Sequence, residues 1–166
     1  MIDSLELHIP KNNELDYRRY LIADEATMSY NLGYGDGGTG VYRQSQEQVQ
    51  RWWQSWQERG NYYAYVLRVS DDTFVGEVSI HFPDETFKSE GVGRISVVIQ
   101  DRYRRQGYGE EALRLLVDLA FVELGLKRLL DDIPPDRKSA IRIFERIGFR
   151  RNSSGLMELS RESDDA

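Results

Sequence analysis

The sequence predicts an α/β fold of the α+β type, with a mixed central sheet of about six to seven strands and helices on both faces. Three observations predict this class. β-rich runs separated by short turns come first and indicate antiparallel strands. Strand and helix patterns then alternate towards the C-terminus, which makes the sheet mixed. The main helical patterns are each followed by a glycine, a residue that commonly ends helices.

The N-terminal segment is predicted to contain one short strand and one helix. Residues 5–9 alternate weakly between apolar and polar side chains, which indicates a strand. Asn13 stands where it can cap a helix that carries Leu15 and Leu21. Residues 24–30 either continue that helix or form a second turn.

A glycine-rich loop separates this segment from the next helix. Residues 31–40 read NLGYGDGGTG and hold five glycines within eight residues, which is unsuited to a regular helix or strand. Ser45 and Gln48 then have the spacing of a capping box. The apolar stripe that follows has helical spacing, and Gly60 suits the end of the helix. That stripe consists of Val49, Trp52, Trp53 and Trp56.

Two β-rich runs form the centre of the predicted sheet. Residues 62–69 and 73–82 are separated by a Ser-Asp-Asp turn and predict a hairpin. Alternate residues of a strand face opposite sides. In the second run, one face is predicted to carry Phe74, Val78, Ile80 and Phe82, and the other Glu77, Ser79 and His81. Residues 94–99 predict a further strand.

The strongest helical pattern covers residues 109–124 and ends at Gly125. Its predicted buried stripe consists of Ala112, Leu113, Leu116, Ala120, Phe121 and Leu124. Residues 129–133 predict a short strand, after which Asp136 is expected to cap the last helix.

The last helix is predicted to end at Gly148. Its apolar face consists of Ala140, Ile143, Phe144 and Ile147. Residues 149–151 and 156–160 then have the pattern of a closing hairpin.

The chain is predicted to form a single domain over residues 1–160, with a polar tail at 161–166. It contains no cysteine, which excludes disulfides, thiolate metal sites and cysteine nucleophiles, and we expect no bound metal. No apolar run approaches the ~20 residues of a membrane span. The first residues also lack the features of a secretory signal. We therefore expect a cytoplasmic protein that does not enter membranes.

The net charge of the chain is -6, which argues against nucleic-acid binding because that requires a basic surface. Two interpretations of the acidity remain. It either serves solubility alone or favours a cationic, amine-bearing partner.

Two arginines and two glycines stand directly before the strongest helix, in the run DRYRRQGYGEEAL at residues 101–113. A helix N-terminus has unpaired N–H groups and a partial positive charge. Gly107 and Gly109 allow the backbone to approach an anion closely, because they have no Cβ atom. Arg104 and Arg105 are unfavourable beside this positive end unless an anion lies between them.

Two interpretations of these arginines remain. They are surface charges that pair with Glu110 and Glu111, or they flank a bound pyrophosphate. The preceding strand, the glycines and the following helix together favour an anion site.

This run resembles the acetyl-CoA-binding signature of the GNAT superfamily of acetyltransferases. The signature is Arg or Gln, two residues, Gly, any residue, then Gly or Ala, and Arg104, Gly107 and Gly109 fill it. The segment LKRLLDDIPPDRKSAIRIFERIGF resembles the second half of the same family, which ends in Gly-Phe, here Gly148 and Phe149. The resemblance is clear over residues 73–149.

The resemblance implies that backbone N–H groups of residues 105–110 hold the pyrophosphate of coenzyme A. It also implies that the end of the preceding strand pairs with the pantetheine arm. In this family that strand is bulged and parts from its parallel neighbour, here residues 129–133. The implied cofactor-binding residues are Val97, Val98, Ile99, Arg104, Arg105, Gln106, Gly107, Tyr108, Gly109, Glu110, Arg137 and Phe144.

Two residues depart from the family pattern. Arg137 stands where members often have an asparagine. Phe144 stands where many members have the tyrosine that protonates the leaving thiolate, and a phenyl ring has no proton to donate. A thiol with a pKa of about 8.5 gives a fair leaving group near neutrality. Water or another hydroxyl is then expected to supply the proton.

The best candidate for the base that deprotonates the acceptor amine is Glu77, because a carboxylate in mid-strand is costly without a role or a partner. The alternative is an ordinary solvent-facing glutamate. His81 is expected to be a surface residue. Asp131 and Asp132 either bind a cationic acceptor or pair with neighbouring basic residues.

The glycine-rich loop is interpreted as a substrate-side loop with Tyr30 and Tyr34 nearby, or as a disordered surface loop. The tryptophan stripe is typical of core packing rather than of a ligand site.

The resemblance therefore implies an N-acetyltransferase that moves acetyl from acetyl-CoA directly to an amine in a ternary complex, with the carbonyl polarised by a main-chain N–H near Val98. The alternative is an acetyl-CoA-binding regulatory module without turnover. A nicotinamide or nucleoside-triphosphate enzyme is disfavoured, because the sequence has no Gly-Lys-Ser/Thr loop and its strand-turn-helix fingerprint lacks the early acidic ribose partner. A serine hydrolase is disfavoured because no Gly-x-Ser-x-Gly motif is present. The acceptor is expected to be a small-molecule or peptide amine, and a homodimer stays open.

Overall fold

The computed structural model describes residues 4–162, so residues 163–166 of the expected tail lie outside the described residues. One sheet of seven strands has the order β1-β2-β3-β4-β5-β7-β6. Its β4 and β5 run parallel, and the other neighbours run antiparallel, which confirms the mixed sheet. The strands are β1 Leu5–His8, β2 Tyr62–Arg68, β3 Thr73–His81, β4 Val92–Ile99, β5 Arg128–Asp131, β6 Arg150–Arg151 and β7 Met157–Ser160.

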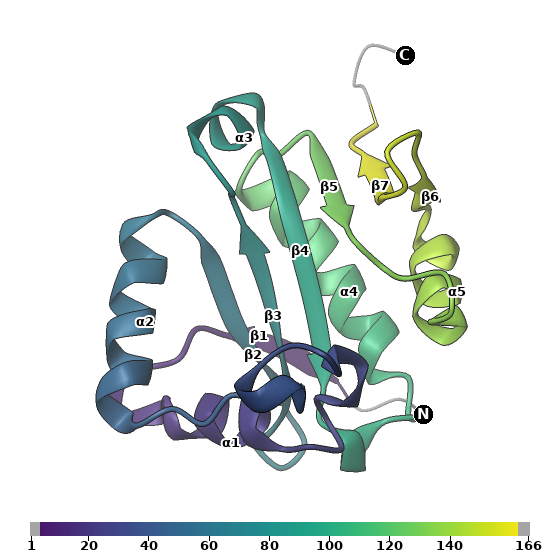
Figure 1. Ribbon diagram of the computed structural model, residues 1–166. Coiled ribbons are helices and arrows are strands. Elements are labelled where there is room, and N and C mark those ends of the chain that lie inside the picture. The colour runs from purple at the N-terminus through teal and green to yellow at the C-terminus, as the bar shows by residue number, and fades with distance from the viewer. Residues whose placement is uncertain (1–3, 163–166) are drawn as a thin grey trace.

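Helices cover both faces of the sheet, as predicted (Figure 1). They are α1 Asp16–Ala23, α2 Gln46–Glu58, α3 Glu85–Glu90, α4 Tyr108–Asp118 and α5 Lys138–Ile147. Short 3-10 turns lie at Asn12–Glu14, Ser29–Asn31, Asp36–Gly38 and Asp101–Tyr103. The sequence reading missed α3, because its six residues are too few to show a helical period. None of the helices in residues 4–162 is long and apolar enough to cross a membrane.

Two hydrophobic cores stabilise the fold, one on each face of the sheet. The larger core lies between the sheet and α4 and α5, and it includes Leu113, Leu129 and Phe149. The smaller core is aromatic and lies between the sheet and α1 and α2, where Trp53 and Tyr65 are buried. Because both faces are covered along β2 and β3, these strands are fixed in position and can align a site on β4.

A bulge in β3 corrects one predicted face. The β2–β3 register shifts between Val66 and Leu67, which pair with Gly76 and Phe74, so Val75 is an extra residue on β3. Phe74 therefore lies on the same side as Glu77 and packs against Tyr65, instead of sharing the face of Val78. The alternation of side chains alone does not reveal such a shift.

Several predicted helix ends are confirmed, and two caps are wrong. Ser45 and Gln48 form the predicted capping box, with bonds of 3.1 and 2.8 Å. Asn13 lies inside a 3-10 turn instead of capping α1, and Leu15 occupies the N-cap position. Asp136 makes no side-chain cap either, because the chain enters α5 one residue later.

The end of the long helix also differs from the prediction. After α4 the chain continues as a π-helical turn, Leu119–Glu123. This wider turn rotates the residues that follow it. Leu124 is therefore 44% exposed, although the sequence placed it in the buried stripe. Gly125 ends the helix as predicted, with a φ of 65°.

The parallel strands β4 and β5 part soon after they meet. They pair from Val92 and Arg128 only as far as Arg94 and Leu130. Beyond this point β4 continues to Ile99 and pairs only with β3, without a register shift. The β3–β4 pairing therefore lacks the bulge that the resemblance implied, whereas the separation of the strands is present (Figure 1).

Candidate active site

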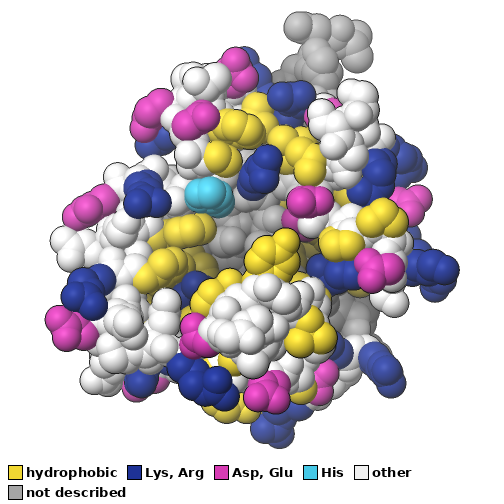
Figure 2. All heavy atoms as spheres, viewed as in Figure 1, with side chains coloured by type: hydrophobic (Ala, Val, Ile, Leu, Met, Phe, Trp, Pro, Cys, Tyr) yellow, Lys and Arg dark blue, Asp and Glu magenta, His cyan; other side chains and the backbone are white. Residues whose placement is uncertain are grey.

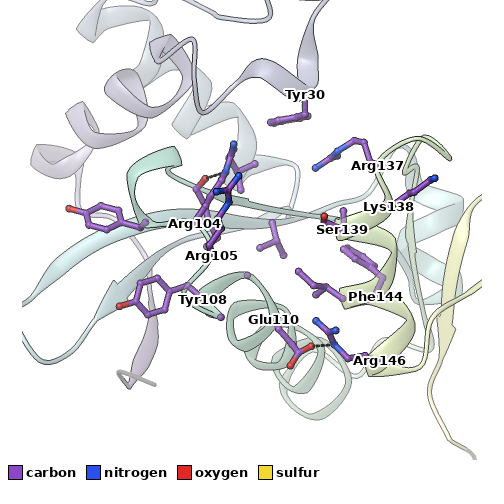
Figure 3. A pocket seen from close by; sticks show the side chains of 18 of the residues that line it. Tyr30, Arg104, Arg105, Tyr108, Glu110, Arg137, Lys138, Ser139, Phe144 and Arg146 are labelled. Atoms are coloured by element: carbon purple, nitrogen blue, oxygen red, sulfur yellow. Dashed lines mark hydrogen bonds and ion pairs between the residues drawn. The ribbon is translucent and has the colours of Figure 1, made fainter. Parts of the chain in front are cut away.

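A cavity of about 710 Å³ lies where β4 ends, between the first turns of α4 and α5 (Figure 3). All of the predicted cofactor-binding residues except Gln106 line this cavity. The residues that the sequence assigned to cofactor binding thus lie together in the structure. Residues that it missed there are Ser29, Tyr30, Tyr103, Asp136, Lys138, Ser139, Ala140, Ile143 and Arg146.

The turn before α4 has the backbone shape of an anion site. Arg105 and Gly107 both have positive φ angles, 64° and 83°, on either side of Gln106. Gly107 is the N-cap and makes no side-chain cap, so no side chain of its own competes for the first N–H groups of α4. Successive N–H groups in such a turn converge into a concavity that suits an oxyanion. A left-handed non-glycine residue costs conformational energy, which is typical of functional turns.

The Arg104 guanidinium is bound to other groups of the chain, although from the sequence we expected it to flank a pyrophosphate. Its Nε donates to the carbonyl of Ile99 at 3.0 Å, and its guanidinium donates to the carbonyl of Thr27 at 2.7 Å. It also pairs with Asp101 at 3.4 Å. Backbone carbonyls and a nearby carboxylate therefore balance its charge, and Arg104 fastens the residues after α1 to the end of β4.

The alternative in which the arginines pair with Glu110 and Glu111 is also wrong. Glu110 pairs with Arg146 and so joins α4 to α5 (Figure 3). Arg105 is exposed and forms no ion pair with any residue in the described range 4–162. Arg105 is therefore the cation that the turn offers to a ligand.

Tyr108 lines the cavity mainly through its backbone. Its side chain is 3% exposed, and its hydroxyl accepts a hydrogen bond from Arg68 at 3.3 Å. The ring anchors the first turn of α4 in the core, which holds the N–H groups of that turn in place.

The wall formed by α5 holds both residues that depart from the family pattern. The guanidinium of Arg137 lies 4.8 Å from the ring of Tyr30. Phe144 is 6% exposed and packs edge-to-face on Phe149 at 4.9 Å. Ser139 points its hydroxyl into the same cavity (Figure 3).

Tyr30, in the segment after α1, lines the cavity. From the sequence we expected only that Tyr30 lies near a substrate-side loop. Its ring is 40% exposed and lies in the cavity wall. Burial and the nearby Glu77 raise the pKa of Tyr30 to about 12, so its hydroxyl keeps its proton near neutrality. Tyr34, the other tyrosine of the expected substrate loop, is 69% exposed and lies outside the cavity.

The glycine-rich loop is held by its own hydrogen bonds. Asp36 donates its N–H to Val41 at 2.8 Å, and Gly40 donates to Tyr34 at 2.8 Å. A Cβ atom on Gly35 would lie 2.4 Å from the carbonyl oxygen of Val41. Gly35 and Gly40 therefore serve close backbone packing, and the loop's own hydrogen bonds do not fit the alternative of a disordered loop.

Glu77 lies on β3 directly opposite Val98 of β4, next to the cavity. Its side chain accepts a hydrogen bond from Arg18 at 2.7 Å, and the residue is only 8% exposed. The alternative of a solvent-facing glutamate is therefore wrong. Sequence reasoning missed Arg18, which also lies 3.7 Å from the ring of Trp52.

Asp131 ends β5 at the place where β4 and β5 part. Burial raises the pKa of Asp131 to about 7, and the nearby Arg137 and Arg94 lower it only in part. The expected pairing with a neighbouring basic residue does not occur, because Arg128 pairs with Glu158 at 3.2 Å. Asp131 is thus a carboxyl that titrates near neutrality beside the site.

The tryptophans divide between two environments. Trp53 is buried in the smaller core, as predicted. Trp52 and Trp56 are partly buried, with Trp52 against Arg18 and Trp56 stacked on His81 at 5.5 Å. In residues 4–162 no group of three His, Asp or Glu side chains is arranged to hold a metal ion.

Comparison with known proteins identifies the class of enzyme. A family model described as an acetyltransferase (GNAT) domain matches residues 5–150. The match covers most of the chain, so the chain belongs to the GNAT family of acetyltransferases, whose members use acetyl-CoA. The resemblance seen in the sequence is confirmed.

Particular relatives cover different shares of the chain. An N-acetyltransferase 9-like protein from Caenorhabditis briggsae is 27% identical over 135 residues, which is 75% of this chain and 68% of the relative. Alpha/beta-tubulin-N-acetyltransferase 9 from Mus musculus is 30% identical over 82 residues, 49% of this chain. That match spans only 33% of the mouse protein.

Solved structures share the fold at low sequence identity. Spermidine N-acetyltransferase from Vibrio cholerae, in complex with CoA and spermine, has a TM-score of 0.77 at 13% identity, over 94% of this chain and 95% of that one. A GNAT family acetyltransferase from Bacillus anthracis has a TM-score of 0.71 at 17% identity, over 96% of each chain.

Proposed function

We propose that this acetyltransferase binds acetyl-CoA in the cavity between α4 and α5 and passes the acetyl group directly to an amine in a ternary complex. The observation that carries the proposal is the convergence of the predicted cofactor-binding residues, Gln106 apart, on one cavity at the end of β4. The acceptor would be a small-molecule or peptide amine.

The residues present fit coenzyme A. The turn at Arg105 and Gly107 would hold the pyrophosphate through backbone N–H groups, with Arg105 adding charge. The edge of β4 beyond Arg94, which has no strand partner on the side of β5, leaves the main chain at Val97 and Ile99 for the pantetheine arm. When bound, the thioester would supply the activated acetyl group.

The chain would polarise the acetyl carbonyl with a main-chain N–H near Val98, as preorganised donors do in oxyanion sites. Val98 lies on β4 opposite Glu77, and the adjacent main-chain groups of Val97 and Ile99 lie on the edge of β4 that β5 leaves open. The absence of cysteine leaves direct attack by the amine as the simplest route.

Two carboxyl groups are candidates for the group that takes the proton from the amine. Glu77 is our proposed base, directly or through water, because it lies beside Val98. Its carboxylate also accepts a hydrogen bond from the Arg18 guanidinium at 2.7 Å, so it is not free to bind the amine alone. Asp131 is the competing candidate, because its pKa of about 7 suits proton transfer near neutrality.

The leaving thiolate would not need a tyrosine at position 144. The cavity is also lined by other residues that carry hydroxyls, among them Tyr30 and Ser139, and Tyr30 keeps its proton near neutrality. A Tyr30→Phe variant that retains its kcat would exclude Tyr30 and leave another hydroxyl of the cavity, such as that of Ser139, or water as the donor.

The proposal is tested by calorimetry with acetyl-CoA and by CoA release over a panel of amines, with a no-amine reaction to measure hydrolysis. Saturable binding together with amine-dependent release supports it. Binding without transfer to any amine would favour the regulatory module, and absence of binding would overturn the assignment of the cavity.

A further inference from the structure

A second hollow adjoins the cavity on the face of the sheet that α2 flanks. Figure 2 shows this hollow over β3 and β4. We call it the acceptor cleft and define its floor by three cross-strand pairs on one face of the sheet. They are Glu77 with Val98, Ser79 with Ser96, and His81 with Arg94. Because Val98 also lines the cavity, the cleft leads to the place where the acetyl group would lie.

One end of the acceptor cleft resembles a site for a cationic group, but the chain fills it itself. A carboxylate beside aromatic rings is the arrangement that binds ammonium ions. Here the Arg18 guanidinium lies 3.7 Å from the ring of Trp52 and 5.2 Å from that of Tyr63, and it pairs with Glu77 at 2.7 Å. The Arg18 guanidinium therefore already occupies the place that a cationic group of a ligand would take.

The other end of the cleft carries an uncompensated positive charge. The Arg94 side chain is exposed and lies 5.9 Å from the ring of Phe87, and within residues 4–162 it forms no side-chain hydrogen bond or ion pair. Its neighbour His81 has a pKa lowered by burial and by Arg94 and Arg59, so the imidazole does not need a counterion near neutrality. The carboxyl group that interacts electrostatically with Arg94 is that of Asp131. Burial raises the pKa of Asp131 to about 7, so this carboxyl is partly protonated near neutrality and only partly compensates the charge of Arg94.

Between these ends lies an apolar wall. Trp52 and Trp56 of α2 lie 5.4 Å apart, and Trp56 stacks on His81 at the floor. This wall suits the carbon skeleton of a ligand, whereas Arg94 offers a planar pair of donors that matches a carboxylate.

We propose that the acceptor is an amine that carries a carboxylate, and that Arg94 binds this carboxylate and so determines specificity. The proposal rests on the proposed function, because it takes the cleft to be the acceptor side of the same site. A polyamine is a poor fit, since Arg18 occupies the cationic end and Arg94 repels a second ammonium group.

The test measures binding as well as turnover. Calorimetry in the presence of CoA compares three peptide amides with free N-termini, Ala-Glu-Ala, Ala-Gln-Ala and Ala-Lys-Ala, with free glutamate and spermidine as further ligands. We expect the glutamate peptide to bind about tenfold to a hundredfold more tightly than the glutamine peptide, as a charge-assisted bond allows. Tighter binding of free glutamate would identify an amino acid as the source of the carboxylate.

Arg94→Gln is expected to remove this difference and to leave the affinities for the glutamine peptide and for acetyl-CoA unchanged. Arg51→Gln removes the same charge from an exposed position on α2 and should preserve the difference. CoA release should follow the same order of acceptors.

Stronger binding of spermidine or the lysine peptide, or an equal loss for all peptides in Arg94→Gln, would overturn the proposal. Failure of the proposed function would look different, as loss of acetyl-CoA binding or of transfer to every amine. The peptide affinities still decide the role of Arg94 in that case.

Discussion

The cavity at α4 and the acceptor cleft beside it are built from different parts of the chain. The cavity presents backbone N–H groups from a turn at Arg105 and Gly107 and main chain from the edge of β4. The cleft presents side chains, several of which already contact each other, as Arg18 does with Glu77 and Trp52. Backbone recognition depends on local conformation, whereas side-chain recognition depends on which distant residues meet.

This difference predicts which property a variant changes, depending on whether the substituted residue lies in the turn of the cavity or in the acceptor cleft. A change in the turn should alter affinity for the cofactor, because the turn would bind it through backbone N–H groups whose directions depend on the φ angles of Arg105 and Gly107. A change in the cleft should alter turnover, stability or acceptor preference, because its charges are coupled across elements.

The largest effect should come from Gly107→Glu, which adds bulk, negative charge and left-handed strain where φ is 83°. We expect acetyl-CoA binding to fall below detection by calorimetry. Gly125→Glu is the matched control, since that glycine has a φ of 65° and open space around it, and it lies beyond the C-terminal end of α4, away from the turn. Unchanged affinity in Gly107→Glu would break the distinction between the two regions.

Glu77→Gln should lower kcat by about 10²- to 10⁴-fold if Glu77 takes the proton. It also leaves Arg18 buried without its partner, which costs ~3–5 kcal/mol of unfolding free energy in comparable pairs. Acetyl-CoA affinity should stay the same.

The double variant Arg18→Met with Glu77→Gln separates these two effects, because it removes both charges. Chemical denaturation should show recovered stability, while kcat should stay low. Recovery of both quantities would make Glu77 a structural partner only and leave Asp131 as the candidate base.

Asp131→Asn should change the pH dependence of stability. The folded state raises the pKa of Asp131 to about 7 from an ordinary value of 3.8, so it retains a proton that the unfolded chain has lost. The unfolding free energy should therefore fall as pH rises from about 4 to about 7, by roughly 4 kcal/mol for a shift of this size. The asparagine variant should lack this fall, while Asp118→Asn at an exposed position of α4 should keep it.

Thermal melts at several pH values check this prediction. The pH dependence of kcat/KM tests in addition whether Asp131 accepts the proton. If Asp131 accepts the proton, kcat/KM of the unaltered protein should rise with pH through about 7, and the variant should lose that rise. A pH-independent melting temperature in the unaltered protein would contradict the raised pKa.

The smallest effect is expected from Gly109→Ala. A Cβ atom there would lie 3.8 Å from Ile99 and 3.9 Å from Ile143, which are ordinary contact distances. Acetyl-CoA affinity should stay within about twofold, and the melting temperature should rise slightly because alanine favours helix over glycine. A large loss of affinity would mean that the ligand approaches the backbone of α4 more closely than this space allows.

Most of the fold was predictable from the sequence, because strands and helices follow local periodicity. The hairpin of β2 and β3, the amphipathic α4 and α5 and the glycines that end them all have local patterns. The bulge at Val75 was not predictable, because it exists only in the register with β2. The caps expected at Asn13 and Asp136 failed because the turns before those helices take other shapes.

The candidate site shows the same division. The cavity was predictable because the conformation of its turn requires particular residues, above all glycine at position 107. Arg18 was not, because it meets Glu77 across 59 positions of sequence. Tyr30 and Asp131 likewise owe their properties to neighbours from other elements.

The fastening of Arg104 has a practical consequence for anyone who wishes to exchange acceptor specificity between enzymes. The Arg104 guanidinium donates hydrogen bonds to the carbonyls of Thr27 and Ile99. The segment after α1, which would be exchanged, is therefore attached to the end of β4 through this one side chain. A transplanted segment whose backbone did not place the carbonyl of position 27 against Arg104 would also loosen the end of β4 that lines the cavity. Redesign of the acceptor side must therefore begin by preserving that single attachment.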